Sequence, residues 1–269
     1  MKKVDTHAHV FSADGPVVAD ARYQPGYSAT PQAYIAHLDQ HDFDYGVLIQ
    51  PSFLGYDNSQ MLAAIALYPQ RLKGVAVVPE TMALSEMRQL KQQGIVGVRL
   101  NLFGKAVPDL TQRNWQAFLA NIQELGWQLE LHCPPAYLVL MMPALQHHKA
   151  PIVLDHFGRI DPELGLNDPD YQAVLDGLDP ERYWIKVSGF YRLATGEQAK
   201  TTAHAALEIL LEKRLEHRLI WGSDWPHTQH ESQISYDTAI QFMQQLLPEP
   251  DLRQQVLGHN ALQLFDFAS

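Results

Sequence analysis

The stretch VDTHAHVFSADG, residues Val4–Gly15, decides between two ways of building a protein from alternating strands and helices. Val4–Val10 is predicted to form a β-strand, and the residues after it form the turn to the next element. In an open doubly wound sheet, this turn is expected to be a glycine-rich loop that binds phosphate. Here the turn is not glycine-rich and follows two histidines, His7 and His9. The stretch therefore favours a closed barrel over an open sheet.

Strand and helix patterns alternate along the rest of the chain, at the spacing of repeating strand–helix units. Seven further strands are predicted at Tyr45–Gln50, Gly74–Val78, Gly97–Leu102, Gln128–His132, Ile152–His156, Trp184–Ser188 and Leu219–Ser223. Eight units predict one domain over residues 1–269, a TIM-like (β/α)8 barrel open to distortion, with a C-terminal helix. An open doubly wound sheet is the alternative.

The helix boundaries carry local signals. Thr30 is predicted to cap a helix that begins at Pro31, because threonine accepts a hydrogen bond there and proline suits the first helical position. Asn58 is a second predicted N-cap. Gly94 and Gly126 are predicted to end helices, since glycine readily adopts the left-handed conformation found after a last turn.

Composition and charge restrict the partners. The chain has 269 residues, 46% of them hydrophobic, and a formal net charge of −10, which argues against nucleic acid and anionic membranes as partners. A small anionic substrate remains compatible, because a few arginines in a cleft can outweigh the distant surface charge. The single cysteine, Cys133, and the lack of a membrane-length apolar run lead us to expect a cytoplasmic protein. The oligomeric state stays open between a monomer and a small homo-oligomer.

Groups that titrate or bind metals gather where the predicted strands end, which is where barrels of this type carry their active sites. His7 and His9 share one face of the first strand, because side chains alternate along a strand. Later strands carry or lead into Arg99, His132, His156, Lys186, Ser188 and Asp224. Any one of these has an ordinary structural explanation, such as a loop histidine or a helix cap. The complete set is improbable unless the side chains converge.

The chain resembles the amidohydrolase superfamily, and within it the branch of 2-pyrone-4,6-dicarboxylate lactonases and related sugar-acid and muconolactone hydrolases. The resemblance runs from the first strand to the last and lies in DTHAHVF, VLIQPSFLGYDN, GVRLNL, IVLDHFGR, WIKVSGFYR and WGSDWPH. It implies a distorted (β/α)8 barrel that hydrolyses a C–O or C–N bond. Its most specific parts are DHFGR and GSDWPH.

The resemblance also implies roles for individual residues. By position, the catalytic set is Asp224, His156, His7 and His9, and the groups that hold an anionic substrate are Arg99, Arg192, Tyr23, Ser52 and Lys105. Lys105 stands where the branch has an arginine, so the charge is kept while the planar two-pronged donor is lost.

The predicted function is hydrolysis of a small lactone that bears a carboxylate. Asp224 would accept a proton from water, the three histidines would polarise the carbonyl, and Arg99 and Arg192 would hold the carboxylate.

The sequence leaves open whether the reaction requires a metal ion. His7, His9, His132 and Asp224 offer three nitrogens and one oxygen, which suits Zn²⁺ with a position left for water. The lactonase branch works without a metal, so no cofactor is expected to be obligatory and one divalent metal, zinc, is the option. Two other functions remain: a zinc-dependent decarboxylase of an unsaturated or aromatic acid, and a non-enzymatic binding barrel, which the convergent set disfavours.

Overall fold

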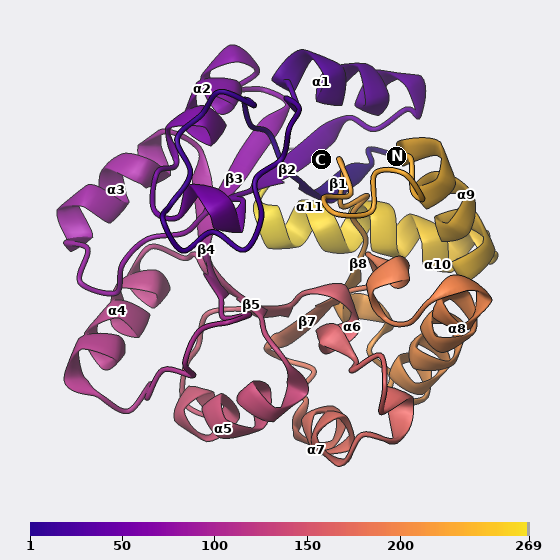
Figure 1. Cartoon of the computed structure of the whole chain (residues 1–269). Helices are drawn as coiled ribbons and strands as arrows, with labels where there is room; N and C mark the ends of the chain where they lie inside the picture. The colour runs from indigo at the N-terminus through magenta and orange to yellow at the C-terminus, as the bar shows by residue number, and fades with distance from the viewer. Residues whose placement is uncertain (268–269) are drawn as a thin grey trace.

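Eight parallel strands form a single sheet whose order follows the chain, β1 to β8 (Figure 1). The computed structural model describes residues 1–267. The strands are β1 Val4–Ala8, β2 Tyr45–Ile49, β3 Leu72–Ala76, β4 Ile95–Asn101, β5 Gln128–His132, β6 Ile152–Leu154, β7 Tyr183–Lys186 and β8 Leu219–Ile220. All eight predicted strands are present, and the predicted barrel is confirmed.

The barrel closes irregularly between β8 and β1. The β8 strand has only two residues, and the chain beyond it continues along β1 through single hydrogen bonds. Thr6 donates to the Trp221 carbonyl at 3.1 Å, and Asp224 donates its backbone N–H to the His7 carbonyl at 2.8 Å. A Cβ on Gly222 would lie 2.5 Å from the His7 backbone nitrogen, so glycine permits this close approach. The barrel is therefore distorted where the two strands meet.

Helices surround the barrel in Figure 1. The longer ones are α1 Pro31–Gln40, α2 Ser59–Leu67, α3 Leu84–Gln92, α4 Arg113–Glu124, α5 Pro135–Leu145, α7 Pro169–Gly177, α8 Gly196–Glu212 and α9 Tyr236–Leu246. The shorter ones are α6 His156–Arg159, α10 Pro250–Gln254 and α11 Asn260–Phe265. Four 3₁₀ helices, η1 Ser52–Leu54, η2 Gly165–Asn167, η3 Phe190–Arg192 and η4 Glu216–Arg218, and the π-helix η5 Gln255–His259 complete the set.

The C-terminal helix α11 packs against the amino-terminal end of the barrel. Phe265 is fully buried and belongs to one hydrophobic cluster with Val4, Val75 and Val153 from the strands. The predicted C-terminal helix is thereby confirmed. Since α11 covers this end, the opposite end remains for a site.

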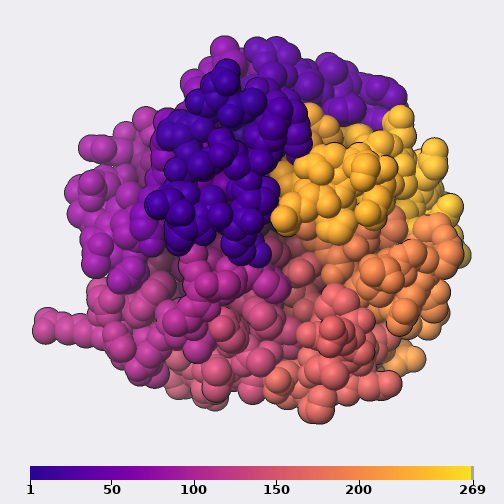
Figure 2. Space-filling model, viewed as in Figure 1, coloured from indigo at the N-terminus to yellow at the C-terminus, as the bar shows by residue number. Residues whose placement is uncertain are grey.

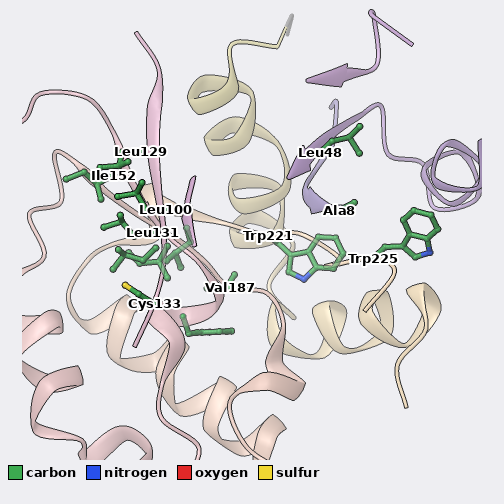
Figure 3. Packing of buried hydrophobic residues seen from close by; sticks show 14 of the residues in the cluster. Ala8, Leu48, Leu100, Leu129, Leu131, Cys133, Ile152, Val187, Trp221 and Trp225 are labelled. Atoms are coloured by element: carbon green, nitrogen blue, oxygen red, sulfur yellow. The ribbon is translucent and has the colours of Figure 1, made fainter. Parts of the chain in front are cut away.

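The main hydrophobic core lies between the strands and the surrounding helices (Figure 3). On β5, Leu129 and Leu131 point into this layer, and Cys133 follows them as a buried free thiol. The intervening residues, Glu130 and His132, therefore face the barrel interior, because side chains alternate along a strand.

The predicted helix starts are confirmed, with one difference in how they are capped. Thr30 accepts a hydrogen bond from the Ala33 N–H, as an N-cap does. Asn58 precedes α2 but uses its side chain elsewhere: its amide donates to the Val77 carbonyl and its oxygen accepts from the Val77 N–H. It thereby fixes the carboxyl end of β3. No helix within residues 1–267 is long and apolar enough to cross a membrane.

Candidate active site

A cavity of about 310 Å³ lies at the carboxyl ends of the strands. Its lining contains five histidines, four arginines and Asp224, in addition to smaller polar and aromatic groups. The N-terminal segment, indigo in Figure 2, covers part of the face seen there. Tyr23 in this segment donates to the Thr228 hydroxyl at 3.2 Å, which ties the loop after β1 to the loop after β8.

Three predicted histidines converge on Asp224. Its Oδ1 lies 3.7 Å from His7 Nε2 and 3.6 Å from His9 Nε2, and its Oδ2 lies 3.9 Å from His156 Nε2. All four side chains are buried. The structure thus brings together, at one wall of the cavity, four residues that lie far apart along the chain.

Left-handed backbone positions direct two of these side chains. His156 has φ 48° and Asp224 has φ 61°, values that are uncommon for residues other than glycine. The strands predicted to continue to His156 and Ser223 instead end at Leu154 and Ile220. Such backbone strain concentrates at functional sites, where the surrounding structure holds it in place.

Asp224 is held as a carboxylate. Arg192 Nε and the Tyr191 hydroxyl each donate to its Oδ2 at 2.6 Å. Burial alone would favour the neutral acid, but Arg192 and the neighbouring histidines outweigh it and hold the pKa of Asp224 well below its usual range. Its second oxygen, Oδ1, faces His7 and His9.

The histidines are neutral near pH 7. Burial lowers the pKa of His7, His9 and His132, and it lowers the pKa of His156 to about 3. His9 Nδ1 lies 2.7 Å from the Ile49 carbonyl, which only accepts, so this nitrogen carries the proton of the neutral ring. His9 Nε2 therefore presents a lone pair towards Asp224.

A network of buried charges lies beneath His7. Lys186 Nζ lies 2.5 Å from Glu130, 3.2 Å from Asp155 and 3.2 Å from His7 Nδ1. Arg99 also binds Asp155, at 3.2 Å, and donates to the Gln50 carbonyl at 2.7 Å. Lys186 and Arg99 are both buried in this network. Asp155 connects these charges to the site, and sequence reasoning missed it although it directly precedes His156.

The groups predicted to hold substrate divide into two sets. Tyr23, Ser52, Arg99 and Arg192 line the main cavity. Lys105 is exposed and lines a smaller neighbouring cavity of about 100 Å³, which Ser52 shares. The structure therefore does not bring Lys105 to the other four.

Two arginines that line the cavity were not predicted to bind substrate. Arg22 comes from the loop after β1, and Arg159 ends α6. Arg159 follows His156 in the sequence, which suggests a role in orienting that ring or a solvent-exposed loop position, but the structure places it in the cavity wall. Arg22 lies on a loop and Arg159 in a short turn with left-handed backbone, where no periodic pattern indicates the direction of a side chain.

A subset of the predicted metal ligands is close enough to share an ion. Donor atoms of His7, His9 and Asp224 lie within 4.8 Å of one another, and so do those of His7, Asp155 and His156. His132 belongs to neither group within residues 1–267, and its Nδ1 lies 3.3 Å from Asn101 Oδ1. The free lone pair of His9 and the carboxylate of Asp224 fit a divalent cation. His7 Nε2, which has no hydrogen-bond partner among residues 1–267, completes this set when the ring proton of His7 is on Nδ1.

Replacing His156 with asparagine is expected to weaken the acid sensitivity of the fold. In the unfolded chain a histidine binds a proton near pH 6.5, whereas folded His156 does so only at about 3. The unfolded state therefore binds more protons below pH 6.5, and stability falls as the pH drops towards 3. Between pH 6.5 and 5 this contribution is about 2 kcal/mol.

Urea unfolding at pH 7 and pH 5 measures this effect. The wild-type protein should lose about 2 kcal/mol more stability than His156→Asn on acidification. The exposed His217→Asn is the control and should behave as the wild type. An equal pH dependence in His156→Asn and the wild type would contradict the burial of a neutral imidazole.

Comparisons with known proteins agree with this architecture. The model of a family described as amidohydrolase matches residues 4–267. The chain is 28% identical to a 4-sulfomuconolactone hydrolase from Rhizobium radiobacter, over 97% of this chain and 89% of that protein. It is also 28% identical to a 2-pyrone-4,6-dicarboxylate hydrolase from Comamonas testosteroni, with the same coverage.

A crystal structure from Acinetobacter baumannii superimposes with a TM-score of 0.98 and 52% identity, over 99% of this chain and 100% of that chain. That protein is described as a probable 2-pyrone-4,6-dicarboxylic acid hydrolase with citric acid bound.

Proposed function

Because this chain belongs to the amidohydrolase family, we propose that it is a hydrolase that opens a small lactone bearing carboxylates, of the 2-pyrone-4,6-dicarboxylate type. The observation that carries this proposal is the convergence of His7, His9 and His156 on Asp224 in one cavity. The hydrolases to which the chain is similar act, by their names, on a muconolactone and a pyrone dicarboxylate.

The charge of the cavity supports an anionic substrate. Its lining carries four arginines against one carboxylate, in a chain whose formal net charge is −10. A cleft of one sign with low-dielectric walls concentrates ligands of the opposite sign. A lactone with carboxylate substituents matches this excess of positive charge.

Asp224 is the proposed general base. A water molecule that donates one hydrogen bond to Asp224 Oδ1 can lose this proton to the carboxylate as its oxygen attacks the lactone carbonyl. The ring C–O bond then breaks, and the ring oxygen takes up a proton to become a hydroxyl. The product is a hydroxy acid, which ionises and releases a proton to solvent at neutral pH.

The histidines are proposed to stabilise the oxygen of the tetrahedral intermediate. Lys186 lies 3.2 Å from His7 Nδ1, and a hydrogen bond donated by Lys186 would leave the ring proton on His7 Nε2. His7 Nε2 and His156 Nε2 then face the cavity beside Asp224 as neutral donors. One such donor typically contributes about 3 kcal/mol to transition-state stabilisation in a water-poor site.

A divalent metal, zinc among them, would be held by His9, Asp224 and the other tautomer of His7, with its ring proton on Nδ1, and would supply a Lewis acid for the carbonyl. We propose that it is not obligatory, because Arg192 and Tyr191 already bind one oxygen of Asp224 and weaken its attraction for a cation.

Enzyme dialysed against a chelator and shown by elemental analysis to contain no transition metal is expected to keep most of its lactonase activity. The lactonase activity of the same dialysed enzyme is then measured again after Zn²⁺ has been added back. A loss of at least tenfold on dialysis that Zn²⁺ reverses would contradict a metal-independent reaction.

The experiment that tests the function is a pH-indicator assay with a panel of carboxylate-bearing lactones. Lactone opening releases one proton for each molecule consumed. A decarboxylase of an unsaturated or aromatic acid would instead release CO₂ and tend to consume a proton, so the same assay with acids of that class distinguishes the two reactions. Failure to turn over any lactone in the panel would overturn the proposal.

We also propose a reducing, cytoplasmic location. Cys133 is a buried free thiol, and burial raises its pKa to about 12, so it is present as an unreactive thiol.

A further inference from the structure

Lys186 is a fully buried cation that lies outside the cavity lining but contacts His7, which belongs to that lining. Its Nζ donates a hydrogen bond to Glu130 and lies 3.2 Å from His7 Nδ1. An ammonium group only donates, so a hydrogen bond between Lys186 and His7 requires a lone pair on Nδ1. The proton of the neutral His7 ring is then on Nε2, the nitrogen that faces Asp224.

A second group could bind the same ring nitrogen. Asp155 Oδ1 lies 3.4 Å from His7 Nδ1 and, among residues 1–267, accepts no hydrogen bond. A carboxylate only accepts, so a hydrogen bond to Asp155 would place the ring proton on Nδ1 and leave a lone pair on Nε2. The ammonium of Lys186 lies 3.2 Å from both atoms. Because Lys186 forms the shorter contact to Nδ1 and also pairs with Asp155, it favours the tautomer protonated on Nε2.

The two tautomers of His7 give the site different chemistry. His9 Nε2 already presents a lone pair, and donor atoms of His7, His9 and Asp224 lie within 4.8 Å of one another. With its proton on Nε2, His7 offers a hydrogen-bond donor, which suits a developing oxyanion. With its proton on Nδ1, the site offers two imidazole lone pairs and a carboxylate, a set that binds a divalent cation. The position of one proton therefore separates the two kinds of site.

We infer that Lys186 is a positioning residue that holds the ring proton of His7 on Nε2, and that it thereby keeps the site a hydrogen-bond donor and disfavours metal binding. Lys186 acts through His7, since it is itself buried beneath the cavity. The catalytic consequence rests on the proposed function. The tautomer of His7 and the affinity for zinc are properties of the protein that can be measured without a substrate.

The double variant Lys186→Met with Glu130→Gln tests this inference. It removes one cation and one carboxylate that bind each other, so the net charge of the buried network is kept. The single variant Glu130→Gln is the matched control, because it retains Lys186 beside His7. A thermal unfolding curve for each protein establishes that it is folded.

Long-range ¹H–¹⁵N NMR of zinc-free protein with ¹⁵N-labelled histidines reports which ring nitrogen carries the proton. The signals of His7 are those missing from the spectrum of His7→Asn. The wild type and Glu130→Gln are expected to carry the proton of His7 on Nε2, and the double variant on Nδ1. A wild-type His7 protonated on Nδ1 would overturn the inference even if the double variant did not fold. Protonation on Nε2 in a folded double variant would overturn it as well.

Zinc affinity is the second readout. In calorimetric titration with ZnCl₂, the double variant is expected to bind zinc at least about 10-fold more tightly than Glu130→Gln, because its His7 already presents a lone pair at Nε2. An affinity within about twofold of that control would refute the link between Lys186 and metal binding. The loss of a nearby cation also favours zinc, so tighter binding supports the inference only together with the change of tautomer.

The outcomes separate this inference from the proposed function. The expected NMR and zinc results together with inactivity of the wild type on every lactone would support the role of Lys186 and reject the lactonase. With an active lactone, the zinc-free double variant should show a kcat about 100-fold below that of Glu130→Gln and a similar KM, since a donor to the tetrahedral intermediate is lost. A kcat equal to that of the control, with the tautomer changed, would show that His7 does not act as this donor.

Discussion

Asp224→Asn is expected to lower kcat for lactone hydrolysis by about 10³- to 10⁴-fold, because an amide cannot accept the proton of the attacking water. The substitution keeps the size of the side chain and its contact distances to His7 and His9. It also removes the charge that Arg192 binds at 2.6 Å, so some loss of stability is expected as well. Steady-state kinetics with the best lactone of the panel measures the effect.

Two controls make this result interpretable. Asp237→Asn changes an exposed carboxylate on α9, away from the cavity, and should leave kcat unchanged. A thermal unfolding curve for Asp224→Asn must show a cooperative transition above the assay temperature. If folded Asp224→Asn keeps kcat within tenfold of the wild type, Asp224 is not the base.

Gly222→Ala is expected to reduce kcat/KM by at least about 100-fold and to lower the melting temperature. The added Cβ would lie 2.5 Å from both the backbone nitrogen and the Cβ of His7, so β1 must shift away from the end of β8. A displacement of about 1 Å in a positioned group can cost roughly 100-fold in rate. Overpacking of this kind typically costs about 1–3 kcal/mol of stability.

The chain provides a matched control for this substitution. Gly26 lies in the loop after β1, and a Cβ added there would meet no atom within 4 Å. Gly26→Ala should therefore retain both the activity and the melting temperature of the wild type. Wild-type activity in Gly222→Ala would mean that the contact between β8 and β1 does not position His7.

Much of the fold could be predicted because it follows from local periodicity. Apolar strand patterns alternate with helical patterns, and parallel strands place all their carboxyl ends on one side of the barrel. His7, His9, His156 and Asp224 could then be grouped without coordinates. The strand ends were less predictable, since the left-handed backbone at His156 and Asp224 has no signature in a side-chain pattern.

The amino-acid sequence by itself determined the barrel, the order of its strands and the identity of the convergent histidines and acid, because these depend on periodicity and on chain direction. Only the tertiary structure decided which arginine binds which acid. Arg192 and Arg99 form ion pairs with Asp224 and Asp155, whereas no carboxylate of residues 1–267 lies at ion-pair distance from Arg159, and Lys105 lies outside the main cavity. Ion pairing depends on distances of a few ångströms between loops, and no spacing along the chain encodes those distances.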